Sequence, residues 1–128
     1  MVIDFFIFTA VVQCHSAGMY RHLDNIIVAL KQTMGNKLTA IYNKSESTLP
    51  FKSGIECKDG LLWGEISTEL AREYDNTFFI DWIQGQKTGF FIDQRENRLL
   101  LGRYSNGKKV LNTFCYSGGF SVYALNNN

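Results

Sequence analysis

The spacing of apolar residues predicts a strand pair and a helix at the start of the chain. Two runs rich in β-branched and aromatic residues, 2–6 and 9–13, predict antiparallel strands that turn at Ile7-Phe8. A tight turn usually contains Asn-Gly or Asp-Gly, which this junction lacks. From Met19 to Met34 apolar residues recur at helical spacing, and Gly35 follows as a stop signal. We therefore expect a helix whose apolar face packs into the core.

The next segment continues the same α+β unit. Its patterns predict a strand at 38–42, a polar exposed loop at 43–60 and a short apolar patch at 61–64. They also predict a hairpin around Asp75-Asn76 with arms at 69–74 and 77–83. The order strand-strand-helix-strand-strand predicts an antiparallel α+β central domain over residues 1–83.

Residues 84–128 have a different pattern. A loop from Gly85 to Gly89 precedes a charged helix at 93–104. An apolar strand at 110–114 then leads to Gly118-Gly119 and a new helix. A strand that ends in a glycine turn and opens a helix is the first half of a nucleotide-binding βαβ unit, because glycine allows close approach of a ligand and the helix start offers free N–H groups. The spacing differs from G-x-G-x-x-G, so a plain strand-to-helix turn remains an alternative.

Composition excludes several classes of protein. The chain has 128 residues, of which 45% are hydrophobic and 20% charged, as in an ordinary globular protein. Its apolar start carries Asp4, is too short to span a bilayer and has no basic region, so we expect neither a signal peptide nor a membrane partner. Three cysteines without a C-x-x-C pair argue against a disulfide scaffold and a metal site, and favour the reducing cytoplasm. The glycine loop lacks the spacing of a Walker motif, which excludes ATP or GTP hydrolysis.

Positive charge is concentrated beside the glycine loop. Residues 84–109 hold six basic and two acidic side chains, whereas residues 1–83 hold seven basic and ten acidic ones. A local excess of basic side chains favours contact with an RNA backbone. A solvated helix face with paired charges explains the same pattern equally well. The predicted RNA contacts are Arg98, Arg103, Lys108 and Lys109.

Three stretches of the sequence resemble a known family of enzymes. They are AVVQCHSAGMYR (10–21), GQKTGFFIDQRENR (85–98) and VLNTFCYSGGFSVYAL (110–125). They resemble the S-adenosylmethionine-dependent methyltransferases that modify large-subunit ribosomal RNA, the cytosine-5 type in particular. The resemblance covers nearly the whole chain. It implies a fragment without the family's N-terminal PUA domain and without most of the catalytic domain, so we expect residues 1–128 alone to be inactive.

The resemblance also implies roles for individual residues. The loop at 85–89 would lie over S-adenosylmethionine, and the turn at Gly118-Gly119 would hold the methionine and ribose end. The implied cofactor contacts are Lys87, Thr88, Gly89, Phe90, Gln94, Arg95, Asn112, Phe114, Tyr116, Gly118 and Gly119. Cys115 lies within this turn, whereas the family's nucleophile lies downstream. We therefore expect Cys115 to be a packing residue and none of the chain's residues to be catalytic.

The combined prediction is an α+β central domain, 1–83, followed by the first helix, strand and glycine turn of a Rossmann-like methyltransferase domain, 84–128. Two other interpretations remain open. The chain could be a non-catalytic module that binds ribosomal RNA through the basic segment and the hairpin. It could instead form a homodimer through an exposed sheet edge. Salt-dependent RNA binding without any effect of cofactor favours the first, and a concentration-dependent size favours the second.

Overall fold

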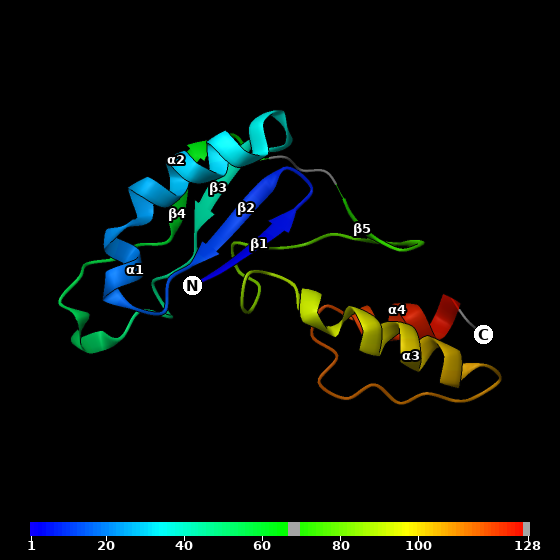
Figure 1. The fold of residues 1–128 in the computed structure, drawn as a ribbon. Coiled ribbons are helices and arrows are strands. Elements are labelled where there is room, and N and C mark those ends of the chain that lie inside the picture. The colour runs from blue at the N-terminus through cyan, green and yellow to red at the C-terminus, as the bar shows by residue number, and fades with distance from the viewer. Residues whose placement is uncertain (67–69, 127–128) are drawn as a thin grey trace.

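The computed structural model describes residues 1–66 and 70–126. Within these residues, a four-stranded sheet has the strand order β1-β2-β3-β4, and β5 and β6 form a separate hairpin. Two helices follow the hairpin (Figure 1). The strands are β1 (Val2–Phe6), β2 (Thr9–Gln13), β3 (Ala40–Asn43), β4 (Gly60–Gly64), β5 (Ala71–Glu73) and β6 (Asn76–Phe78). The α-helices are α1 (Ala17–Arg21), α2 (Leu23–Met34), α3 (Arg95–Ser105) and α4 (Gly119–Asn126), with short 3-10 turns at Gly35–Lys37, Phe51–Ser53 and Ile92–Gln94.

The sheet is mixed, so the antiparallel prediction is wrong for one of its pairs. β1 and β2 are antiparallel, with Phe6 opposite Thr9 and Ile7-Phe8 as the turn. β2 and β3 are parallel, because α1 and α2 cross over between them. The apolar patch at 61–64 is β4, which pairs antiparallel with β3. The sequence pattern predicted these strands and the helix between β2 and β3, but it did not predict that β3 runs parallel to β2.

The predicted helix at 19–34 is divided in two. Ser16 caps α1, because its Oγ accepts a hydrogen bond from the Met19 backbone N–H. His22 then ends α1, and α2 begins at Leu23. Gly35 follows α2 with a φ of +50°, which confirms its predicted role as the helix stop. The apolar face of α2 packs on one face of the sheet, as predicted.

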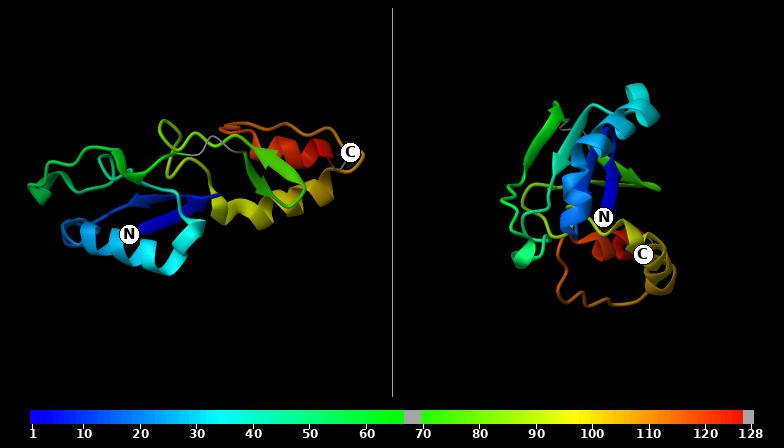
Figure 2. Two further views of the ribbon diagram at one scale, coloured as in Figure 1. Left: turned by 90° about the horizontal axis from the view of Figure 1, so that it is seen from above. Right: turned by 60° about the vertical axis from the view of Figure 1, so that its left-hand side comes forward.

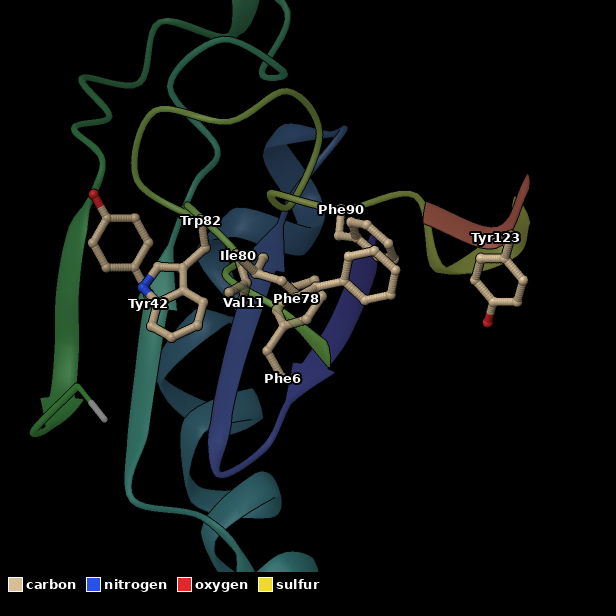
Figure 3. Packing of buried hydrophobic residues seen from close by; sticks show 8 residues of the cluster. All are labelled: Phe6, Val11, Tyr42, Phe78, Ile80, Trp82, Phe90 and Tyr123. Carbon is tan, nitrogen blue, oxygen red and sulfur yellow. The ribbon is translucent and has the colours of Figure 1, made fainter. Parts of the chain in front are cut away.

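A second hydrophobic core covers the other face of the sheet and reaches the C-terminal helices. Phe6 stacks on Trp82 with ring centroids 6.1 Å apart, and Phe78 packs against Phe90 at 5.0 Å. The same cluster includes Tyr123 of α4 (Figure 3). This core therefore contains residues from both sides of the predicted domain boundary at 83. The boundary itself stays a prediction.

The predicted hairpin forms, but its second arm ends at Phe78 and not at residue 83, and its turn is one residue earlier than predicted. Glu73 pairs with Asn76, so Tyr74 and Asp75 form the turn, and Tyr74 has a φ of +52°. Glu69, which the prediction placed in the first arm, lies outside the described residues. The hairpin lies beside α3 and α4 and away from the helices of the first sheet (Figure 2).

The predicted helices at 93–104 and after Gly118 are confirmed as α3 and α4, which pack on each other. The Ser105 hydroxyl of α3 donates a hydrogen bond to the Ala124 carbonyl of α4 at 3.2 Å. The predicted strand at 110–114 is wrong, because this segment is irregular and Leu111 and Phe114 are 87% and 102% exposed. A strand needs a neighbouring strand for its N–H and C=O groups. No other described strand pairs with this segment.

None of the described helices is long and apolar enough to cross a membrane.

Candidate functional site

A hollow of about 360 Å³ lies at the start of α4, and several predicted cofactor residues line it. Its walls come from the loop before α3, from the start of α3 and from the irregular segment that leads into α4. The lining residues are Gln86, Phe91, Gln94, Arg98, Asn112, Thr113, Phe114, Cys115, Tyr116, Ser117, Gly119 and Phe120. The structure thus brings five of the predicted cofactor residues, Gln94, Asn112, Phe114, Tyr116 and Gly119, to one hollow.

Tyr116 joins the segment before α4 to the glycine loop. Its hydroxyl lies 3.3 Å from the Gln86 carbonyl and 3.2 Å from the Gly89 carbonyl, to which it donates. Its ring packs edge-on against Phe91, with centroids 5.6 Å apart. Burial raises the pKa of the Tyr116 hydroxyl. The φ of Tyr116 is +49°, an uncommon value for a residue other than glycine.

The sheet holds the opposite side of the same loop. The Gln13 side-chain amide donates to the Lys87 carbonyl at 3.0 Å, and the Thr88 hydroxyl donates to an Asp4 carboxylate oxygen at 2.5 Å. Lys44, which follows β3 and is buried, donates its Nζ to the Gly85 carbonyl. Burial lowers the pKa of Lys44. These contacts turn Thr88 toward the sheet, so its side chain does not line the hollow.

Two glycines allow the loop to pack tightly. A Cβ on Gly85 would lie 2.3 Å from the Asp81 carbonyl oxygen and 2.8 Å from the Tyr116 hydroxyl. A Cβ on Gly89 would lie 2.7 Å from the Trp82 Cα, and Gly89 also has a φ of +114°. Gly89 therefore supports the loop backbone against Trp82 and does not line the hollow.

The N-terminus of α4 faces the hollow through Gly119. The first N–H groups of a helix lack intrahelical acceptors and carry a partial positive charge, which favours an anionic ligand. Gly118 closes the preceding turn by donating its N–H to the Cys115 carbonyl at 2.7 Å. Asn112 is held beside the helix because its side-chain amide donates to the Ser121 hydroxyl at 2.8 Å.

Arg98 forms a buried ion pair with Glu73 below the hollow. Its Nε and one Nη donate to the two carboxylate oxygens at 2.8 and 2.6 Å, and the other Nη donates to the Phe91 carbonyl at 2.9 Å. The Tyr123 hydroxyl lies 3.0 Å from the Glu73 carboxylate, to which it donates. Burial raises the pKa of Tyr123. Arg98 is only 2% exposed, so this geometry does not support its predicted contact with RNA.

Most of the remaining predicted residues do not line the hollow. The Lys87 ammonium pairs with Asp93 at 2.7 Å, and Phe90 is buried in the core. Arg95 is exposed, lies 3.6 Å from Glu73 and does not line the hollow. Cys115 is exposed and lines the hollow, so its prediction as a packing residue is wrong. The predicted RNA contacts that remain exposed, with no ion-pair partner among the described residues, are Arg103, Lys108 and Lys109.

Comparison of the sequence with those of known proteins finds relatives that are named as an enzyme. The chain is similar to ribosomal RNA large subunit methyltransferase I. It is 41% identical to the protein of that name from Tolumonas auensis over 118 residues, 38% identical to that from Aeromonas hydrophila over 128, and 42% identical to that from Pseudoalteromonas translucida over 127. These matches cover 90%, 98% and 98% of the chain. The chain spans 29% to 32% of the length of these relatives, and no family model matches it.

The hollow fits part of the S-adenosylmethionine that a methyltransferase uses. Its volume is within the range of small-molecule sites, and its aromatic rings provide a surface for an apolar or planar group. The start of α4 suits the carboxylate end. None of the lining residues is Asp or Glu, so the lining itself offers no carboxylate to the ribose hydroxyls or the ammonium group. The described residues also contain no cluster of three or more His, Cys, Asp or Glu side chains that could hold a metal ion.

Sequence reasoning missed residues that only the fold brings to the site. Phe91 and Phe120 line the hollow, although neither is distinguishable in the sequence from a core aromatic. Asp4, Gln13 and Lys44 fix the glycine loop from the sheet, and no local signal connects them to it.

Proposed function

We propose that the chain is part of an S-adenosylmethionine-dependent methyltransferase that modifies large-subunit ribosomal RNA, with cytosine C5 as the methylated position. The observation that carries this proposal is the identity of about two residues in five to ribosomal RNA large subunit methyltransferase I over nearly the whole chain. The hollow at the start of α4 supports it, because polar side chains and a helix N-terminus meet there. Residues 84–128 would be the cofactor side of a Rossmann-like catalytic domain, and 1–83 the central domain.

The cofactor would occupy the hollow beside Gly119. The carboxylate of its methionine part would face the N–H groups of α4, and Asn112 and Gln94 would offer amides to its polar atoms. Tyr116 would hold the loop at 85–89 in position, and Gly118 would shape the turn. The bound cofactor would supply an electrophilic methyl group. In this proposal Lys87, Thr88, Gly89 and Phe90 act by fixing the loop.

Arg103, Lys108 and Lys109 would contact the phosphate backbone of the RNA. All three are exposed at the end of α3 and in the segment after it. Such contacts release counterions, so affinity should fall steeply with salt. The local positive charge suits RNA, whereas the formal net charge of the chain is only +1. A cytoplasmic location goes with this substrate and is part of the proposal.

We also propose that residues 1–128 alone bind the cofactor weakly and transfer no methyl group. The support is the missing carboxylate among the residues that line the hollow. Methyl transfer to large-subunit RNA is tested with labelled S-adenosylmethionine and a longer protein that contains this chain. Digestion of the product to nucleosides and mass spectrometry then identify the methylated base. Methylation of another base would overturn the cytosine C5 part, and no transfer at all would overturn the enzyme.

Cofactor binding to residues 1–128 is tested by calorimetric titration. Asn112→Ala should weaken any binding of S-adenosylmethionine, whereas Asn36→Ala, an exposed asparagine outside the hollow, should not. Loss of one neutral hydrogen bond corresponds to roughly a two- to tenfold change in affinity. Equal effects of both variants would show that the cofactor binds elsewhere. RNA binding that depends on salt and is indifferent to cofactor would instead favour a non-catalytic RNA-binding module.

A further inference from the structure

A second cavity lies between the turn of the β1–β2 hairpin and the β5–β6 hairpin. Its volume is about 170 Å³, and it shares no lining residue with the hollow beside α4. A cavity of roughly 150 Å³ lined by apolar side chains can accept a benzene ring. This second cavity is therefore large enough for one planar aromatic ring, such as a pyrimidine.

Aromatic side chains form much of the cavity wall. Phe6, Phe78 and Phe90 are buried and belong to one cluster (Figure 3), and they all line the cavity. Phe5 also lines it but is 37% exposed, so its ring lies at the boundary with solvent. Aromatic rings are the surfaces on which proteins stack unpaired bases.

Two arginines at the same cavity provide positive charge. The Glu73 carboxylate also lines it, but Arg98 neutralises that charge through two short hydrogen bonds. Arg95 reaches Glu73 only at 3.6 Å and is otherwise exposed, so most of its donors remain available. Arg72 pairs with Asp75 at 3.6 Å, and both side chains are exposed, which makes this pair weak. A guanidinium group next to an aromatic cavity suits the phosphate that accompanies a base.

We propose that this cavity binds one unpaired base of an RNA strand, with Arg95 and Arg72 on the adjacent phosphates. The size of the cavity selects a single ring, and the positive rim selects a nucleotide over an apolar peptide side chain. The turn residue Ile7 also lines the cavity and has a φ of +58°, a strained value for a β-branched residue. The inference rests on the proposed function, in which RNA is the substrate, and adds a base-binding site outside the cofactor region.

The test measures binding of a short single-stranded RNA that contains 2-aminopurine to residues 1–128. Phe5→Ala and Arg95→Gln should each weaken binding, and Phe5→Ala should also reduce the fluorescence change that stacking causes. Loss of one stacked base corresponds to roughly a 5- to 150-fold weaker affinity. Phe8→Ala is the matched control, because Phe8 is equally exposed at 37% in the same β1–β2 hairpin and does not line the cavity. Arg21→Gln is the control for Arg95→Gln, because it removes an exposed arginine on α1 that does not line the cavity.

A third variant separates stacking from charge. Ala71 lines the cavity, so Ala71→Leu should fill part of it without changing any charge, and it should weaken RNA binding as Phe5→Ala does. Circular dichroism and urea unfolding establish that each variant is folded. If RNA binding is weakened only by substitutions at Lys108 and Lys109, the base site is overturned and the RNA substrate survives. If the unchanged chain binds no RNA, the base site is overturned, whereas the proposed substrate is decided by the methyl-transfer assay.

Discussion

The ion pair between Glu73 and Arg98 gives the sharpest prediction for stability. Glu73→Ala would leave the guanidinium of Arg98, which is 2% exposed, with the Phe91 carbonyl as its remaining hydrogen-bond acceptor among the described residues. It would also remove the acceptor 3.0 Å from the Tyr123 hydroxyl. Removing one partner of a buried ion pair costs about 3 to 5 kcal/mol, because a buried charge is left without compensation. That is a large part of the roughly 5 to 15 kcal/mol that stabilises a typical domain.

Urea unfolding, followed by the fluorescence of the tryptophans, measures this loss. For a slope of about 2 kcal/mol per molar urea, the midpoint should fall by about 2 M. Asp75→Asn is the control, because it alters the exposed pair with Arg72 and should change the free energy of unfolding by less than about 1 kcal/mol. If Glu73→Ala costs no more than this control, Arg98 is not isolated from solvent and the reasoning fails.

A double substitution tests the cause of the loss. Glu73→Leu together with Arg98→Met removes both charges and leaves apolar side chains of similar volume. Such replacements of buried pairs are often neutral or stabilising. The double variant should therefore be more stable than the sum of the two single losses predicts, by more than about 1 kcal/mol. Additive losses would mean that the two side chains act independently.

Three further results are expected. Gly89→Ala should cost about 2 kcal/mol or more in urea unfolding, because its Cβ would lie 2.7 Å from a backbone atom, whereas Gly35→Ala, with nothing within 4 Å, should cost less. Tyr116→Phe should lower the free energy of unfolding by about 1 kcal/mol and speed amide hydrogen exchange in the loop at 85–89. Unchanged exchange in this loop would count against the hydroxyl contacts. A hydrogen bond from Lys87 lowers the pKa of Asp93, so this carboxylate stabilises the fold above about pH 4, and that stability is lost as the pH falls through the lowered pKa. Asp93→Asn should lack this part of the pH dependence of urea unfolding, and an unaltered profile would refute the pairing.

Local sequence patterns predicted those helices and strands whose structure is determined by neighbouring residues in the sequence. The helical spacing before Gly35 placed α2, because an apolar face and a glycine stop are properties of neighbouring residues. The same holds for the first strand pair and for the helix that follows Gly118. The clustering of Asn112, Tyr116 and Gly119 came from the resemblance to a family, and the hollow brings the three together.

The sequence by itself therefore determined approximately where most strands and helices form. It missed the break at His22 within the predicted helix, the early end of the second hairpin arm and the irregular form of 110–114. Tertiary structure decided partners and directions. The parallel return of β3 depends on the path of α1 and α2, and the irregular form of 110–114 depends on which strands pair with it. Arg98 forms a buried ion pair because Glu73, 25 residues away in sequence, packs beside it. Thr88 meets Asp4 across 84 residues, and such long-range contacts are set by the packing of whole elements, which no local pattern records.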